Sequence, residues 1–593
     1  MEKQRQEQIA QAEEILGDNL GKSSFAKGYF FGEFHRESLP PYPDIHSIPG
    51  LDDRLKALKE FVSESIDPVK IDREKEIPHE IITGLGELGI LGACLPEWCG
   101  GSELSQVAYC QLLEVLGARC ASTSLFVNAH HSIGPRALVL FGNEVQQQKW
   151  LPKLATGEWL SAFALTEPEA GSDAANVQTT ATLSDDGTHY VLNGEKRWIT
   201  NGAIAKVLTV MAKTRLPDNS GTAITAFLVT PDMPGFEVVE ARMEKCGVRG
   251  SVTSRLRFRE MKVPAENVLG KPGKGLKVAL TVLDFGRTTF GATCTGIAKE
   301  CVAITARHAN QRVQFQQQLG SFELVKEKIA LMESMAYAME ACTYQTAALI
   351  DADQGDFMLE TAMLKVFATE TLWPIVYDTF QIHGGMAYFC DEPYERMMRD
   401  ARLNSIGEGA NDVLRTFMVL VGMREVGLNL EAVLHAFFKP ITGAGVLCRF
   451  IAKKTGSMLL TPQIPVRSSE LENDVATLAK TLSKFGKRVE WLLRVHQMEI
   501  MDRQYQLGRV ADVVMDIYAS TCVLRRLDQL LVDPKVEESE KQRQLKTGRY
   551  FLAFAQNRTR LAFAAMRNNQ DPDTTSLADD VLAQFPSAAD ADE

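Results

Sequence analysis

Apolar residues recur at three- and four-residue steps over two long stretches of the chain. The first stretch covers about residues 50–160, with Leu55–Val62 as an example, and the second covers about residues 276–430. This spacing places apolar side chains on one face of a helix. The two stretches therefore predict an N-terminal all-helical domain and a later helical bundle. Pro374 is expected to interrupt one helix of the bundle, because proline lacks a backbone N–H.

Between residues 161 and 275 the pattern changes to short runs typical of strands. Val207–Met211 and Ala223–Val229 are two such runs, and Asp-Gly, Asn-Gly and Pro-Gly turns lie among them. Polar and apolar residues alternate in Arg255–Phe258, as in a strand with one face in water. These residues predict a β-domain between the two helical domains, so that the fold is mainly α with a central β-domain.

The two ends of the chain extend this helix–sheet–helix order. A chain of 593 residues is too long for a single core. Residues 431–593 are again helical in pattern and include a polar linker at Thr461–Pro465, which indicates an appended C-terminal helical domain. Residues 1–49 are interpreted as an N-terminal extension.

A basic segment lies near the start of this appended region. No acidic residue stands between Glu431 and Glu470, whereas Arg449 and Lys453 lie there among apolar residues. If residues 444–455 form a helix, its charged and apolar sides predict an interfacial helix, with membrane contact through about 438–460. Packing of the same segment on the protein itself remains the alternative.

Composition and charge narrow the class of protein. The chain carries 64 Lys and Arg against 76 Asp and Glu, a net charge of −12, which argues against broad nucleic-acid binding. Its 11 cysteines form no Cys-x-x-Cys pair, and no spacing indicates a metal site. Free cysteines fit a reducing compartment.

The polar, acid-containing N-terminus matches neither a signal nor a transit peptide, and no apolar run is long enough to span a bilayer. We therefore expect a cytoplasmic protein, with peripheral contact at the inner face of the membrane left open.

Five separate segments resemble the flavin and active-site segments of acyl-CoA dehydrogenases. They are Ala164–Asp173, Trp198–Gly202, Arg312 with Phe315, Gln381–Gly385 and Arg399–Asp412. The resemblance covers about residues 23–430. The stretch from Ser24 to Pro43 and the long C-terminal region look like the very-long-chain branch of this family.

The resemblance implies a fold and an activity. The fold would be an acyl-CoA dehydrogenase-like helical domain, a β-barrel-like domain and a helical bundle, with an extra C-terminal helical domain here. The activity would be FAD-dependent α,β-dehydrogenation of long-chain acyl-CoA to trans-2-enoyl-CoA in fatty acid β-oxidation. An electron-transferring flavoprotein would accept the electrons. An acyl-CoA oxidase that uses oxygen and a respiratory-complex assembly protein of the same fold remain alternatives.

The resemblance also implies that Glu408 is the catalytic base. Dehydrogenation needs a base for the α-proton, and glycines on both sides of Glu408 leave its backbone free to adopt unusual φ and ψ angles. A carboxylate in an apolar pocket has a raised pKa, which suits a general base. Some members of the family carry the base at the position of Gly286, where glycine cannot act. Gly407 and Ala410 depart from the family pattern beside the base.

Further residues are implied to contact FAD or substrate. Arg312 is expected to pair with the FAD pyrophosphate; since relatives supply it and Gln381–Gly385 from a neighbouring subunit, we expect a homodimer. The substrate-side residues would be Ser172, Asp284, Arg287 and Gly409. The expected FAD contacts are Phe163, Leu165, Thr166, Gly171, Ser172, Trp198, Ile199, Thr200, Arg312, Phe315, Gln381, Ile382, Gly384, Gly385, Ala410, Asn411 and Asp412.

Two of these assignments have structural alternatives. Asp284 and Arg287 have the spacing of an intrahelical ion pair, and Asn411 with Asp412 looks like a helix N-cap. The segment Ser124–Gly134 corresponds to the bottom of the acyl pocket in relatives. There Ser124 and Asn128 are larger than the glycines of the very-long-chain type, which argues against the longest substrates and leaves the preferred chain length open.

Overall fold

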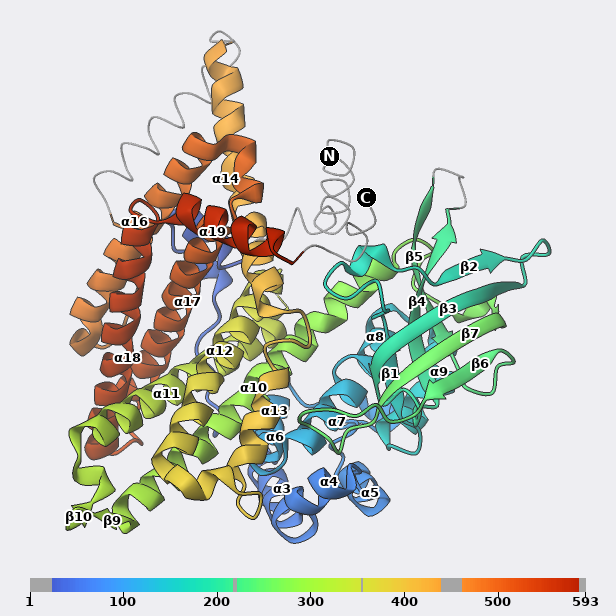
Figure 1. Ribbon diagram of the computed structural model, residues 1–593, viewed down its shortest axis with the longest axis horizontal. Coiled ribbons are helices and arrows are strands. Elements are labelled where there is room, and N and C mark those ends of the chain that lie inside the picture. Colours follow the sequence, from blue (N-terminus) through green and yellow to red (C-terminus); the bar gives the residue numbers. More distant parts are fainter. Residues whose placement is uncertain (1–23, 217–220, 354–355, 439–460, 586–593) are drawn as a thin grey trace.

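The computed structural model describes residues 24–216, 221–353, 356–438 and 461–585 (Figure 1). The predicted interfacial helix at 444–455 and the first 23 residues of the N-terminal extension lie outside the described residues. Within the described ranges, no helix combines the length and the apolar character needed to cross a membrane.

Short helices form the first part of the chain. Several begin with a side-chain cap: Asp67 accepts from two backbone N–H groups of α4, Ser105 accepts from one of α6, and Asn143 with Gln146 forms a capping box on α9. Helix α6 is buried on most sides, which makes it the centre of this part. The helices are α2 (Lys27–Phe30), α3 (Leu51–Ser65), α4 (Pro68–Glu74), α5 (His79–Glu87), α6 (Gln106–Arg119), α7 (Ala121–His131), α8 (Gly134–Phe141) and α9 (Glu144–Ala155).

An eight-stranded sheet follows, with the order β6-β7-β3-β2-β4-β5-β8 and with β1 parallel to β4. The predicted alternation at Arg255–Phe258 is confirmed, because Leu256 and Phe258 are buried while Arg255 and Arg257 bond to Glu195. The strands are β1 (Ser161–Ala164), β2 (Thr180–Leu183), β3 (His189–Thr200), β4 (Val207–Arg215), β5 (Thr222–Val229), β6 (Phe236–Glu240), β7 (Thr253–Pro264) and β8 (Val268–Leu269).

Long helices form the bundle next to this sheet, and α10 is the longest of them. Helix α10 packs against α6, α11 and α12 and leads from the sheet to a small hairpin at the opposite end of the molecule (Figure 1). The elements are α10 (Gly275–Gln311), β9 (Val313–Gln314), β10 (Gln317–Gln318), α11 (Glu323–Ala352), α12 (Met358–His383), α13 (Tyr394–Leu403) and α14 (Asn411–Phe438).

The expected break at Pro374 is wrong, because α12 continues through this residue to His383. Proline removes one backbone hydrogen bond from a helix interior. Pro374 itself is only partly buried, while buried residues on both sides of it pack into the bundle. Tertiary packing thus overrides the local preference.

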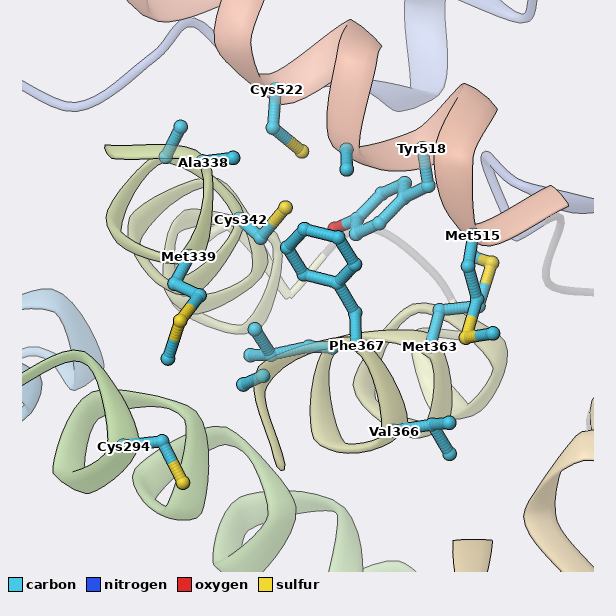
Figure 2. Close-up of a cluster of buried hydrophobic side chains, with 14 of the residues drawn as sticks. Cys294, Ala338, Met339, Cys342, Met363, Val366, Phe367, Met515, Tyr518 and Cys522 are labelled. Carbon is cyan, nitrogen blue, oxygen red and sulfur yellow. The ribbon is translucent and has the colours of Figure 1, made fainter. Parts of the chain in front are cut away.

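Three of the C-terminal helices, α16, α17 and α18, pack on the bundle and share its hydrophobic core, whereas α19 has no buried residue. Figure 2 shows Phe367 of α12 among Cys342 of α11 and Tyr518 and Cys522 of α17. The N-terminal segment joins the same core, since Ser24 and the backbone of Ala26 donate hydrogen bonds to Glu360 of α12. The C-terminal helices are α16 (Glu472–His496), α17 (Gln504–Val532), α18 (Glu538–Ala565) and α19 (Asp571–Ala583).

Candidate functional site

Glu408 lies in the turn between α13 and α14 and has an unusual backbone. Its φ is +58° and that of Gly409 is +97°, and a left-handed conformation is costly for a residue with a Cβ. The carboxylate oxygen Oε2 is buried and has no hydrogen-bond partner among the described residues. A Cβ on Gly286 of α10 would lie 2.6 Å from this oxygen. Position 286 and the Glu408 carboxylate therefore face the same point in space.

The charge of Glu408 is set by burial and by two cations. Burial raises its pKa to about 7, while the positive charges of Arg287 and Lys365 act in the opposite direction. Arg287 bonds to Asp284 at 3.1 Å, so the ion pair expected from their spacing is present. Burial also raises the pKa of Asp284 to about 6, and Thr361 donates a hydrogen bond to it at 2.8 Å. An unpaired carboxylate with a pKa near neutrality can accept a proton at physiological pH.

Replacing Glu408 with glutamine is expected to stabilise the protein at pH 8 but not at pH 4. The folded-state pKa of about 7 lies above the ordinary value of 4.5, so wild type loses stability as pH rises from about 4.5 to 7. Glutamine cannot ionise and avoids this loss, which is at most on the order of 3 kcal/mol. Thermal unfolding of wild type and Glu408→Gln between pH 4 and pH 8 checks the result. A stability difference that does not depend on pH would contradict the burial of this carboxylate.

Lys365 of α12 is a residue of this site that the sequence analysis missed. Its side chain is fully buried, and Nζ donates to the Gly409 carbonyl at 2.7 Å and to Asn411 Oδ1 at 2.9 Å. A lone lysine in the apolar run Ala362–Ala368 was the available signal, since buried lysines need a partner. The N-cap expected at Asn411 is wrong: α14 begins at this residue, and its side chain bonds to Lys365 and Thr369 instead.

The helix before Glu408 holds the β-domain against the bundle. Asp400 of α13 is buried and accepts a hydrogen bond from the backbone of Val248 at 2.6 Å. Arg399 binds both carboxylate oxygens of Asp72, at 3.0 and 2.7 Å, and donates to the Cys246 carbonyl at 2.9 Å. The loop before β7 needs Gly247, because a Cβ there would lie 2.3 Å from the Arg399 carbonyl. The loop that carries Glu408 is thus tied to the domain that carries the predicted flavin shelf.

The predicted shelf residues lie along β1, the loop that follows it, and the end of β3. The backbone of Arg197 donates to the Thr166 carbonyl at 2.9 Å, which joins the shelf to β3. Trp198 is 53% exposed, and its backbone φ is +60°. Ile199 is buried in the β-domain core, so its backbone is the part that can reach a ligand. Phe163, Leu165, Thr166 and Thr200 are partly exposed, and Gly171 and Ser172 are exposed.

The predicted FAD contacts around Arg312 lie at the other end of the bundle. Arg312 follows the last residue of α10, and the exposed Phe315 lies in the turn between β9 and β10. Gln381, Ile382, Gly384 and Gly385 lie at the end of α12, beside the end of α10: the rings of His308 and His383 are 4.3 Å apart. Arg312 lies 26 positions after Gly286, which corresponds to about 39 Å along the axis of α10. Within one chain, therefore, Arg312 lies far from Glu408.

Several features of both clusters fit a flavin dinucleotide. The half-exposed Trp198 offers an aromatic face, and Arg312 offers a guanidinium group suited to a phosphate. Gly171, Gly384 and Gly385 have no atom within 4 Å of where a Cβ would lie, which leaves backbone open to close approach. Phe315 and Gln316 both have positive φ angles, +50° and +65°. Such strained residues concentrate at binding sites.

Four family models match the chain, one after another. They are the N-terminal, middle and C-terminal domains of acyl-CoA dehydrogenase at residues 53–158, 162–261 and 273–420, and the ACAD9/ACADV C-terminal domain at residues 469–584.

Individual proteins match over most of their length. The chain is 36% identical to the very long-chain specific acyl-CoA dehydrogenase of Rattus norvegicus, over 86% of this chain and 79% of that protein. It is 32% identical to the probable acyl-CoA dehydrogenase FadE10 of Mycobacterium tuberculosis, over 97% and 90%. A solved acyl-CoA dehydrogenase from Bacillus anthracis in complex with FAD has a TM-score of 0.78 and 29% identity, and the match covers 94% of each chain. The chain belongs to the acyl-CoA dehydrogenase family.

Proposed function

We propose that this protein dehydrogenates acyl-CoA thioesters at the α and β carbons and that Glu408 removes the α-proton. The observation that carries the proposal is the Glu408 carboxylate, whose Oε2 is buried, has no partner among the described residues and lies against Gly286. Burial raises its pKa to about 7, which places proton uptake within the physiological range. Membership of a family with FAD-bound relatives supports the same reaction class.

The roles of the surrounding residues follow from their positions. FAD, when bound, supplies the hydride acceptor that no side chain can provide. Trp198, with Thr166 and Thr200, would hold the flavin ring on the shelf, and the α-proton would be held at Glu408 Oε2. Arg287 and Lys365 place positive charge near the Glu408 carboxylate, which favours its ionised form before the proton is taken.

We further propose that the FAD site is completed by a second copy of the chain. About 39 Å of α10 separates the level of Glu408 from Arg312, and Figure 1 shows the β9–β10 hairpin at the opposite end from the sheet. Aromatic residues are exposed at that end, including Phe315, Tyr388 and Phe389, and exposed apolar clusters mark interfaces. A symmetric dimer would supply Arg312 of one subunit to the shelf of the other.

We propose that the preferred length of the acyl substrate depends on a row of polar side chains between α7 and α10. This row, called the polar seam, consists of Ser124, Asn128, Ser132, Thr289 and Thr293. Thr289 donates to Asn128 Oδ1 and lies 3.2 Å from the Ser132 hydroxyl, and Ser124 contacts Thr293 at 2.8 Å. Thr289 is less than one helical turn from Gly286, so the seam starts beside the base. Asn128 Nδ2 is buried and has no partner among the described residues. These polar side chains occupy space that an alkyl chain would otherwise use.

Replacing Asn128 with glycine is expected to move the best substrate toward longer chains. Each additional buried methylene contributes about 0.8 kcal/mol, or about fourfold in transition-state binding. The rate of flavin reduction by a series of saturated acyl-CoAs measures the shift. Thr295→Ala is the matched control, because its hydroxyl faces Thr343 of α11 rather than α7. An unchanged optimal acyl chain length in Asn128→Gly would show that the polar seam does not determine substrate length.

The proposed activity is tested by mixing FAD-loaded protein anaerobically with saturated acyl-CoAs from short to very long. We expect loss of the oxidised flavin absorbance, followed by fast reoxidation with an electron-transferring flavoprotein and slow reoxidation with oxygen. Fast reoxidation by oxygen would instead identify an acyl-CoA oxidase. Bound FAD that no acyl-CoA reduces would favour a scaffold role, such as respiratory-complex assembly.

Membrane contact through about 438–460 and a cytoplasmic location are proposed on the sequence alone. The basic residues and the lack of acidic residues between Glu431 and Glu470 support attraction to anionic lipid. Sedimentation with anionic vesicles should recover the full chain but not a variant with Arg449, Lys453 and Lys454 changed to glutamine.

A further inference from the structure

The turn that carries Glu408 adopts a backbone that other contacts must maintain. Glu408 and Gly409 both have positive φ angles, +58° and +97°. Strain of this kind persists only where the surroundings hold it in place. The orientation of the carboxylate therefore depends on the groups that bind the two peptide carbonyls of the turn.

Lys365 binds this turn from α12. Its ammonium group donates to the Gly409 carbonyl at 2.7 Å and to Asn411 Oδ1 at 2.9 Å, so it bridges the residue after the base and the start of α14. Asn411 is held in turn by Thr369, one helical turn further along α12, at 3.0 Å. The side chain of Lys365 is completely buried, and a buried ammonium group is retained only where its hydrogen bonds and charge are compensated.

A second cation approaches the same turn from α10. Arg287 Nε lies 3.5 Å from the Glu408 carbonyl oxygen and is fixed by its ion pair with Asp284. Two consecutive carbonyls, those of Glu408 and Gly409, therefore each face a cation from a different helix. The same two positive charges oppose the effect of burial on the Glu408 carboxylate.

The charged and titratable groups around Lys365 identify Glu408 as its main electrostatic partner. Burial lowers the pKa of Lys365 to about 8, and the Glu408 carboxylate is the largest influence that raises it. Arg287 opposes this, and Cys294 and Glu370 add smaller favourable effects. Burial raises the pKa of the Cys294 thiol to about 12, so this group is uncharged near neutrality. Glu370 already pairs with Arg415 at 3.2 Å.

We propose that Lys365 is a positioning residue for the base: its ammonium group holds the Glu408–Gly409 turn in its strained form and keeps the carboxylate ionised. This inference rests on the proposed dehydrogenase function, because it concerns the same base. Lys365 touches neither of the reacting carbons in this account and acts through the turn and through its charge.

The first test compares Lys365→Gln and Lys365→Met with wild type in anaerobic flavin reduction across pH. Glutamine keeps a donor but no charge, whereas methionine removes both. We expect the acidic limb of the rate profile to move to higher pH by about one unit in both variants, since a nearby cation no longer favours the ionised base. The plateau rate should also fall about 10- to 100-fold in Lys365→Met, because the turn loses its support.

Lys299→Met is the matched control for loss of a packed lysine. Lys299 pairs with Glu114 and Glu340, away from the base turn, so this variant should lose stability without moving the acidic limb. If Lys365→Met does not fold, Lys365→Gln decides the result, because it keeps a hydrogen-bond donor of similar length. An acidic limb at the wild-type pH in Lys365→Gln would overturn the proposal.

A second readout needs no turnover. Glu408→Gln is introduced into wild type and into Lys365→Gln, and the thermal unfolding midpoints are compared at a pH of about 7.5, between the pKa of Glu408 and that of Lys365. The gain in midpoint from Glu408→Gln should be larger without Lys365, since the ionised carboxylate then lacks a compensating charge. Equal gains would overturn the proposal. Failure of wild-type flavin reduction would contradict the proposed function alone, because this comparison still measures the coupling between Lys365 and Glu408.

Discussion

Replacing Glu408 with glutamine is expected to slow anaerobic flavin reduction by acyl-CoA about 10²- to 10⁴-fold. Glutamine keeps nearly the same shape but cannot accept the α-proton, so binding of FAD and substrate should persist while the chemical step fails. Stopped-flow absorbance of the FAD-loaded protein with saturating acyl-CoA measures this rate directly. The largest effect is expected here because no other carboxylate is placed against Gly286 by the described part of the chain.

Glu360→Gln is the matched control for this result. Glu360 is also buried, and burial raises its pKa to about 7. Its Oε1, however, accepts hydrogen bonds from Ser24 and Ala26 of the N-terminal segment, and Glu408 rather than Glu360 lies against Gly286. The control should keep a rate close to that of wild type. Retention of the wild-type rate by Glu408→Gln would exclude this residue as the base.

Arg312→Ala is expected to weaken FAD binding about 10-fold or more, since a hydrogen bond to a charged group contributes about 1.5–3 kcal/mol. If the site is shared between subunits, mixing this variant with Glu408→Gln should restore activity at an FAD concentration that saturates the wild-type protein but leaves Arg312→Ala largely empty. A hybrid dimer would have one site with both Glu408 and Arg312 intact. Random reassociation of equal amounts gives hybrids in half of the dimers, so about a quarter of the wild-type sites should be active.

The restored activity distinguishes a shared site from one contained in a single chain. If Glu408 and Arg312 served the same FAD within one chain, no hybrid would contain an intact site, and mixing would restore nothing. Arg307→Ala is the control for this experiment, since Arg307 is exposed near the same end of α10. Arg307→Ala should bind FAD as wild type does. Mixing it with Glu408→Gln should give only the activity expected from mixing wild type with Glu408→Gln.

The fold was predictable where periodicity reflects burial. The alternation at Arg255–Phe258 correctly indicated a strand with one buried face. The helix break expected at Pro374 was wrong because packing along α12 outweighs the loss of one hydrogen bond. The cap expected at Asn411 failed for a similar reason, since its side chain finds partners on α12, which local sequence cannot show.

The candidate site was predictable only in part. The identity of Glu408 came from its resemblance to a family pattern, and the structure adds the burial and the contact with Gly286. Lys365 was missed because its partners lie in a different helix and a turn, and spacing along one element cannot reveal such contacts. Arg312 and Glu408 are far apart because α10 is one long continuous helix. Motifs alone do not show where such a helix ends, so this separation could not be predicted from the sequence.

The central claim, that this chain oxidises acyl-CoA with Glu408 as the base, is tested most directly by product analysis of an anaerobic single turnover. FAD-loaded protein is mixed with one equivalent of a long saturated acyl-CoA, and flavin absorbance and thioesters are measured together. The account predicts one equivalent of trans-2-enoyl-CoA for each flavin reduced, and none with Glu408→Gln. Unchanged acyl-CoA beside fully oxidised flavin in the wild-type protein would contradict it.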